Sequence, residues 1–296
     1  MEGLIYHDKP NLVSPYLVMG FEGWPDAGGV SSGVVSYLRE KLAARKLAEI
    51  RPDDFYVFQS QGNEAGRPIT RIEGGIVRTV SFPSIVFWFH QREGSAHDLI
   101  VSLGREPELR WNTYVETVLD LVREFNVQGV YTVGGTYDRV PHTIEPVITA
   151  VVNEPGLRAA MRGHGIGLTS YEGPSSIHTM LLLAARRKGI SAASLWGHAP
   201  HYIQVPNARV CYSVLQKLVR MLGVDLDLEG ARKAAEYLDQ RVNAAIEEKA
   251  ELKEHVKRLE EEYLKGRQQV GELLSEDILK EVEDFLQKKK DGEGQA

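Results

Sequence analysis

Residues 16–29 read YLVMGFEGWPDAGG, a short apolar run followed directly by a turn rich in glycine. The apolar run at 16–21 is typical of a buried strand, and Pro25 with its neighbouring glycines indicates a turn. The residues that follow have helical spacing, and we expect them to form a helix over 29–47. A strand, a turn and a helix in this order form the repeating unit of α/β folds.

The same alternation continues through most of the chain. Short apolar runs bounded by turn residues predict further strands at 55–59, 75–82, 84–90, 129–133 and 192–196. Apolar residues at helical spacing predict helices at 108–125, 177–188 and 209–222. Such alternation builds a mostly parallel sheet that helices cover on both faces. We therefore expect residues 1–225 to form a three-layer α/β/α core domain with a mostly parallel central sheet.

The composition changes after residue 225. Residues 226–296 contain three of the chain's 24 aromatic residues and no proline. Positions spaced alternately by four and three residues form a heptad seam, which predicts one long helix that needs a partner. The seam consists of Leu238, Val242, Ala245, Lys249, Leu252, Val256, Leu259 and Tyr263. We predict a helical extension at 226–290, with a second helix after Ser275, and a disordered tail at 291–296.

The charge distribution argues against a nucleic-acid partner. The chain has 35 Lys/Arg and 41 Asp/Glu; residues 226–296 hold 13 and 19 of these, leaving 22 of each for the core. A near-neutral core with an acidic extension offers no basic face that would collect phosphates. We expect neither nucleic-acid binding nor membrane spanning, since the longest apolar runs are far shorter than a membrane helix. The single cysteine, Cys211, cannot form an internal disulfide, which favours a reducing, cytoplasmic location.

Polar residues that follow strands are the candidate site, because open α/β sheets bind ligands at the carboxyl ends of their strands. The turn after the first strand supplies Gly23, Trp24, Asp26 and Gly28. Asp26 has two interpretations: it caps the following helix, or it belongs to a functional turn. The glycines would let an anion approach the helix start, although this is neither a Walker loop nor a dinucleotide fingerprint.

Two Pro-His pairs follow two other strands. Asp138 and His142 come after the strand at 129–133, and His198 and His201 come after the strand at 192–196. As an enzyme, the histidines would transfer protons while carboxylates such as Asp26, Asp138 or Glu172 orient them. We prefer a structural interpretation, in which the histidines bond loop carbonyls, because neither a nucleophile nor metal-ligand spacing accompanies them. No metal or cofactor is expected.

Five motifs, in this order, resemble the proteasome assembly chaperone family. They are GWPDAG at 23–28, GREPELRW at 104–111, VPHT at 140–143, YEGP at 171–174 and SLWGHAPHY at 194–202. The resemblance covers about residues 10–260. It departs at Pro25, where Asn is common, and at 144–146, where Ile-Glu-Pro replaces Thr-Arg-Pro and weakens an anion site. The resemblance implies a phosphorylase-like α/β/α fold and a homo-oligomer, with a trimer favoured; some members are loosely labelled ATP-grasp, which would imply ATP.

The resemblance to this family also implies a function. Archaeal and eukaryotic relatives help to assemble proteasome α-subunits, in several cases through a C-terminal hydrophobic-Tyr-any tail; this sequence ends Gly294-Gln295-Ala296, so we expect another docking mode. We expect a non-catalytic, self-associating assembly or scaffold factor with an unknown protein client. The alternatives are a small-molecule enzyme or binding protein for a nucleoside or nucleotide, an ATP-grasp-like carboxylate–amine ligase, or a helical adaptor formed by the acidic extension.

Overall fold

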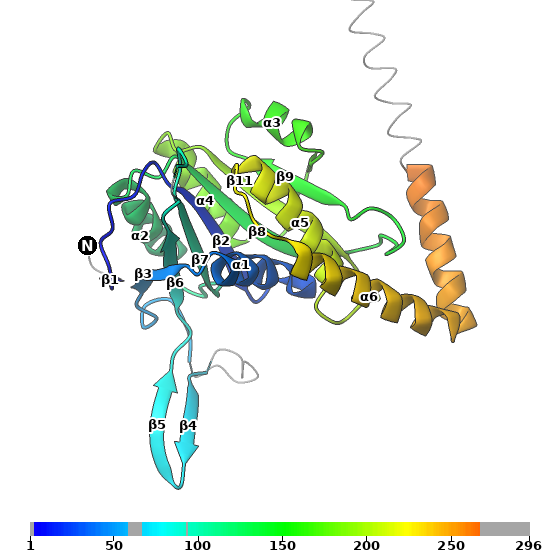
Figure 1. Cartoon of the computed structure of the whole chain (residues 1–296), viewed down its shortest axis with the longest axis horizontal. Helices are drawn as coiled ribbons and strands as arrows, with labels where there is room; N and C mark the ends of the chain where they lie inside the picture. The colour runs from blue at the N-terminus through cyan, green and yellow to red at the C-terminus, as the bar shows by residue number, and fades with distance from the viewer. Residues whose placement is uncertain (1–2, 59–66, 93, 267–296) are drawn as a thin grey trace, which may run out of the picture.

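The computed structural model describes residues 3–58, 67–92 and 94–266, which form a twisted mixed sheet with helices on both faces (Figure 1). Within these residues the sheet has nine strands in the order β1-β3-β6-β7-β2-β8-β11-β9-β10. Their bounds are β1 Leu4–Tyr6, β2 Tyr16–Glu22, β3 Arg45–Ile50, β6 Ile85–His90, β7 Leu99–Arg105, β8 Gly129–Asp138, β9 Ile148–Val152, β10 Gly167–Leu168 and β11 Ala192–Pro200.

The centre of the sheet is parallel. Strands β7, β2, β8 and β11 all run the same way, with Tyr16 opposite both Leu99 and Gly129 and Ala192 opposite Val130. Strands β1, β3 and β6 pair antiparallel on one side, and β9 pairs antiparallel with β11 on the other. The predicted α/β fold with a central parallel sheet is confirmed, and the antiparallel strands extend it at both edges.

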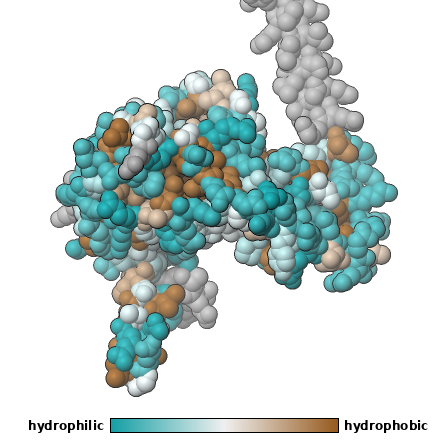
Figure 2. All heavy atoms as spheres, viewed as in Figure 1, coloured by the Kyte–Doolittle hydropathy of each residue, from teal (hydrophilic) through white to brown (hydrophobic). Residues whose placement is uncertain are grey.

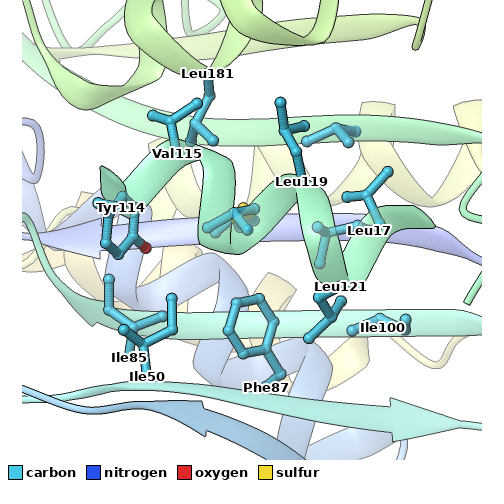
Figure 3. Packing of buried hydrophobic residues seen from close by; sticks show 14 of the residues in the cluster. Leu17, Ile50, Ile85, Phe87, Ile100, Tyr114, Val115, Leu119, Leu121 and Leu181 are labelled. Carbon is cyan, nitrogen blue, oxygen red and sulfur yellow. The ribbon is translucent and has the colours of Figure 1, made fainter. Parts of the chain in front are cut away.

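Helices cover both faces of the sheet. They are α1 Val30–Lys41, α2 Trp111–Glu124, α3 Leu157–Gly163, α4 Ile177–Arg187, α5 Ala208–Met221 and α6 Glu229–Glu247. Side chains of β2 alternate between the layers: Leu17, Met19 and Phe21 pack with α2 and α4, whereas Val18 packs with α1 and α5. Figure 3 shows the first of these layers, with Leu119 and Leu121 of α2 lying over the sheet. Both faces of the central strands are therefore buried, as a parallel sheet requires.

Several predicted elements have different bounds. The helix predicted at 29–47 ends at Lys41, and residues 45–50 form β3 instead, because Leu47 and Ala48 are fully buried in the sheet. Residues 55–58 form no strand; Phe55 and Tyr56 pack into the core from a loop. Strands β8 and β11 are longer than predicted and continue to Asp138 and Pro200.

The strand predicted at 75–82 belongs to a separate hairpin. β5 Ile76–Ser81 pairs antiparallel with β4 Ile69–Glu73, and this two-stranded hairpin projects away from the body (Figure 1). Its surface carries both hydrophobic and hydrophilic side chains (Figure 2). All residues of both strands are exposed.

The long helix predicted over 238–263 is interrupted. α6 ends at Glu247, and residues 250–266 form a second helix after a break at 248–249, where Lys249 interrupts the apolar seam. Val256 and Leu259 of this second helix are 6% and 1% exposed. The prediction that these two seam positions need a partner chain is wrong, because they are buried within their own subunit. The helix predicted after Ser275 and the tail at 291–296 lie outside the described residues.

Candidate functional site

The carboxyl ends of β2, β8 and β11, together with the loops that follow them, form the rim of the sheet. The loop after β2 is fastened to β8 by a 2.7 Å hydrogen bond from the Gly135 N–H to the Pro25 carbonyl, beside a parallel bridge between Asp26 and Gly135. A Cβ at Gly135 would lie 2.3 Å from the carbonyl oxygen of Ala27. Only glycine lets the loop approach the strand this closely.

Asp26 stabilises the start of α1. Its Oδ1 accepts a 3.0 Å hydrogen bond from the Ser32 N–H, in the first turn of the helix. Burial raises the pKa of this carboxyl, although the bonds from Ser32 act in the opposite direction. Asp26 thus satisfies one N–H group of the first turn from outside the N-cap position, which Gly29 occupies, and this structural role accounts for an aspartate here. Gly28, with φ +63°, accepts a 2.7 Å bond from the Asn207 N–H at the start of α5, while Gly23 and Trp24 are exposed.

Asp138, His198 and Thr149 form a chain of hydrogen bonds at the end of β8. The His198 Nδ1 lies 2.7 Å from the Asp138 Oδ2, and the His198 Nε2 lies 2.9 Å from the Thr149 Oγ1. The bond from His198 lowers the pKa of Asp138, because it stabilises the ionised carboxylate. Since a carboxylate only accepts, Nδ1 carries the proton in this arrangement.

His142 is held by two side chains from distant parts of the sequence. The Tyr202 hydroxyl lies 2.7 Å from both the His142 N–H and Nδ1, and the His142 Nε2 lies 3.0 Å from the Asn243 Oδ1 on α6. The hydroxyl accepts from the backbone N–H and donates to Nδ1, so the Nε2–H donates to Asn243. Both ring nitrogens of His142 are therefore engaged by the chain itself.

His201 faces the second helix of the extension. Its Nδ1 donates to the Asp138 carbonyl at 3.2 Å, and its ring lies 5.4 Å from that of His255, at 81°. The His255 ring also meets Tyr202 edge-on at 5.9 Å. The loop after β11 is therefore in contact with residues 250–266.

Ion pairs and hydrogen bonds hold the helical extension against the rim. Arg139 pairs with Glu262 at 2.9 Å, and the Thr143 hydroxyl donates to Glu260. On α5, Arg209 pairs with Asp239 of α6 at 2.8 Å and donates to the Ile144 carbonyl at 2.9 Å. The extension thus binds the loop after β8 along much of its length.

A small pocket remains beneath this cover. It lies between the loop at 140–147, the start of α5 at Asn207 and Arg209, and Leu238 of α6, and its volume is about 20 Å³. That space admits about one water molecule and is far smaller than the pockets that hold drug-sized ligands. His142 and His198 line it, so the rim histidines face little open space in this arrangement.

The sequence model of the PAC2 family matches residues 20–246, which include the whole rim but not the second helix of the extension at 250–266. The chain belongs to the PAC2 family. Comparison with the curated proteins finds no match. The predicted family is thereby confirmed, whereas the ATP-grasp label finds no support in these comparisons.

Solved structures agree with this membership. The proteasome-assembly chaperone homologue of Mycobacterium tuberculosis is similar at 28% identity and TM-score 0.73, over 81% of this chain and 99% of that chain. A PAC2 family protein from Streptomyces avermitilis gives 28% identity and TM-score 0.73, over 82% and 99%. An archaeal proteasome activator from Pyrococcus furiosus, at 20% identity and TM-score 0.63 over 83% and 99%, shares the fold.

The rim of this PAC2 protein gathers most of the predicted site residues. Asp138, His142, His198 and His201 lie together, and Asp26 lies beside the same strand at Gly135. Glu172 does not join them through any contact of the described residues; it is exposed in the segment between β10 and α4.

Sequence reasoning missed the residues that hold the histidines. Tyr202 stands in the motif SLWGHAPHY and could have been chosen on that ground. Thr149, Asn243 and His255 carry no such signal, because their role depends on β9 and the extension folding next to the rim. The described residues contain no group of three or more His, Cys, Asp or Glu side chains placed to hold a metal. Nor is any described helix long and apolar enough to cross a membrane.

Proposed function

We propose that this PAC2 protein is a non-catalytic, self-associating scaffold that assembles or holds a protein client. The family membership supports this proposal, because the M. tuberculosis neighbour is named a proteasome-assembly chaperone homologue and the P. furiosus neighbour a proteasome activator. The client of this chain is unidentified, and a trimer is the favoured oligomer.

One observation carries the proposal: the polar groups of the rim are used by the chain itself. His142 bonds Tyr202 and Asn243, and His198 bonds Asp138 and Thr149. A catalytic site presents its proton-transfer groups to a substrate, with a space for the reacting atom. Here those groups tie strands, loops and the extension together, over a pocket of about 20 Å³. Rigid loops at the surface of a layered α/β/α body are better suited to contact another protein than to catalyse a reaction.

Light scattering coupled to size-exclusion chromatography tests self-association directly. The full chain at micromolar concentration should elute as a species heavier than the 33.1 kDa monomer, with three copies as the favoured number. An oligomer of another size would correct the copy number and leave self-association standing. A monomer at every concentration tested would contradict the proposal.

A second candidate function rests on the chain Asp138, His198 and Thr149. A carboxylate on one imidazole nitrogen and a hydroxyl on the other is the arrangement that moves protons in hydrolases. If the extension opened, a small ligand such as a nucleoside, a nucleotide or phosphate would reach this group. Thermal-shift measurements with these compounds, and with ATP and magnesium, decide between the scaffold and the ligand-binding function. Stabilisation that is lost in His198→Ala supports a binding protein. No shift with any compound rejects the binding function.

The proposed location is the cytoplasm. Cys211 packs beneath α1, and burial raises the pKa of its thiol to about 12. A half-buried thiol that stays protonated supplies no thiolate to form a disulfide. Fractionation of native cells tests this location. Recovery of the protein outside the cytoplasmic fraction would contradict the proposal.

A further inference from the structure

Three exposed aromatic side chains stand at the carboxyl edge of the sheet. Trp24 is 60% exposed in the loop after β2, Tyr137 is 42% exposed near the end of β8, and Tyr171 is 67% exposed in the segment before α4. In the described residues, the other exposed aromatics are Phe82, next to the hairpin, and Tyr237 on the helical extension. Single exposed apolar side chains are common on proteins, whereas aromatic side chains gathered at one edge are typical of a protein contact.

Glu106 joins the loop of Trp24 to the segment of Tyr171. Its N–H donates to the carbonyl of Glu22, the last residue of β2, at 2.9 Å, and its Oε1 accepts a 2.8 Å bond from the Ile177 N–H at the start of α4. Tyr171 precedes this helix start in the same exposed segment. The end of β2 and the segment before α4 are therefore neighbours.

The strand of Tyr137 adjoins the other side of the same loop. The Gly135 N–H donates to the Pro25 carbonyl at 2.7 Å, and Pro25 follows Trp24 directly. Tyr137 comes shortly after Gly135 on β8. The three aromatic residues thus stand on neighbouring segments of one open edge, with Trp24 on the middle segment. Trp24, Tyr137 and Tyr171 together form the aromatic edge.

Carboxylates without ion pairs lie beside the aromatic edge. Glu22 and Glu172 are exposed and form no ion pair in the part of the chain that the structure describes. The neighbouring cations Arg105 and Arg139 are already paired with other carboxylates. Burial raises the pKa of Asp26, and the charge of Glu22 adds to that rise, so the negative charge of Glu22 acts on the loop of Trp24. The aromatic edge is therefore acidic.

Charge and chemistry indicate a basic protein segment as the occupant. Carboxylates repel nucleic acids and anionic membranes, because both carry phosphates. A two-fold contact between the aromatic edges of two copies would place carboxylates against carboxylates, which is unfavourable. The face of a tryptophan or tyrosine ring attracts the charged group of an arginine or lysine, and a carboxylate beside the ring can bond that group. An aromatic, acidic surface is thus complementary to basic side chains.

We propose that the aromatic edge, with Glu22 and Glu172 beside it, is the surface on which this protein holds its client, and that it binds a segment of the client rich in arginine or lysine. Trp24 receives a cationic side chain, and the two carboxylates bind the cations that flank it. This inference rests on the proposed scaffold function and names the chemistry of the client.

Fluorescence anisotropy with two labelled peptides tests the chemistry of the occupant. One short peptide alternates arginine and leucine, and the matched peptide has glutamate in place of each arginine. The full chain should bind the arginine peptide, more weakly as the salt concentration rises, and should not bind the glutamate peptide. Failure of the arginine peptide to bind, or equal binding of both peptides, would overturn the proposal.

Matched substitutions locate the peptide on the protein. Trp24→Ala should weaken binding of the arginine peptide about fivefold, and Glu22→Gln about twofold, because each removes one attraction for a cation. The controls lie on the helical extension: Tyr237→Ala removes an aromatic ring that is 61% exposed, and Glu248→Gln removes an exposed carboxylate. Both controls should bind the peptide as wild type does. Equal weakening by Trp24→Ala and Tyr237→Ala would overturn the aromatic edge as the binding surface.

Light scattering on the same samples separates this inference from the proposed function. Wild type and Trp24→Ala should have the same oligomeric mass. A lower mass in Trp24→Ala would show that a second copy occupies the aromatic edge, and would overturn the client as its occupant. A wild-type chain that is monomeric throughout would instead contradict the proposed function itself, whichever peptide it binds.

Discussion

His142 and Asn243, 101 residues apart in the sequence, share a 3.0 Å hydrogen bond that joins the loop after β8 to α6. With the ion pair between Arg139 and Glu262, it holds the helical extension over the carboxyl ends of the central strands. These bonds make the rim a structural joint between the core and the extension, and we propose that the protein acts through its outer surfaces.

Removing the Asn243 amide should weaken this joint. In Asn243→Ala the Nε2–H of His142 loses its acceptor, and we expect the free energy of unfolding to fall by about 1 kcal/mol. Urea denaturation of the full chain measures the change. Gln240→Ala, at an exposed position on the same helix, is the control and should stay within about 0.5 kcal/mol of wild type. Equal effects of the two substitutions would argue against the joint.

Tyr202→Phe should cost more than Asn243→Ala. The hydroxyl serves both the backbone N–H and the Nδ1 of His142, a residue that is 5% exposed. Its loss leaves a donor and an acceptor without partners, which we expect to destabilise the fold by about 1–3 kcal/mol. Tyr212→Phe removes a hydroxyl that bonds only the exposed Gln216 among the described contacts, and should change little. Chemical denaturation of both variants provides the comparison.

Acid should destabilise the protein through His178. This residue stands in the first turn of α4 with its ring against those of Phe21 and Trp196, and complete burial lowers its pKa to about 3. The unfolded chain binds a proton near pH 6.5 and the folded one does not, so stability is full above that pH and is lost as the pH falls. Between pH 7 and 5 the contribution falls by about 2 kcal/mol.

Urea denaturation at both pH values checks the His178 prediction. In His178→Gln, the loss of unfolding free energy between pH 7 and 5 that comes from this histidine should disappear. This holds even if the variant is less stable than wild type at pH 7. Asp138, whose pKa is lowered, adds its own loss of stability only at pH values near and below 4, where the unfolded carboxyl begins to bind protons. An unchanged slope between pH 5 and 7 in His178→Gln would contradict the assignment.

The fold was largely predictable because local patterns specify it. The apolar run at 16–21 and the helical pattern at 177–188, which Gly189 ends, can each be read from a short stretch of sequence, and the structure confirms the strand and the helix. The error at 45–47 has the same origin: Leu47 continues the helical pattern of the preceding residues, but pairing of β3 with β6 across the sheet decides its conformation.

The site was predictable only in part. Placement of Asp138, His142, His198 and His201 at one edge follows from the order of the strands, since parallel strands bring their carboxyl ends together. The partners Thr149, Asn243 and His255 come from an antiparallel edge strand and from a helical extension that turns back at residues 248–249. A heptad pattern predicts which side chains share one face of a helix, but it does not predict which surface covers that face. The burial of Val256 and Leu259 within the subunit therefore could not be predicted from the sequence.

Gly135→Ala should separate the loop after β2 from β8. The added Cβ would stand 2.3 Å from the carbonyl oxygen of Ala27, a backbone atom that yields only if the loop moves. We expect a loss of about 1–3 kcal/mol in the free energy of unfolding. Gly163→Ala is the matched control: its Cβ would meet no described atom within 4 Å at the end of α3, so stability should stay equal or rise slightly. A neutral Gly135→Ala would show that the loop is not held as described.

Hydrogen exchange of the full chain, read by mass spectrometry on the peptide covering 138–147, is the decisive test of whether the extension and the rim are joined. We predict slow exchange of the His142 amide, which donates to Tyr202, and faster exchange in Val256→Asp, whose buried charge releases residues 250–266. The peptide covering β2 should exchange equally slowly in both proteins. Exchange of 138–147 at the rate of an unstructured peptide in the wild-type chain would show that the rim and the extension are not joined.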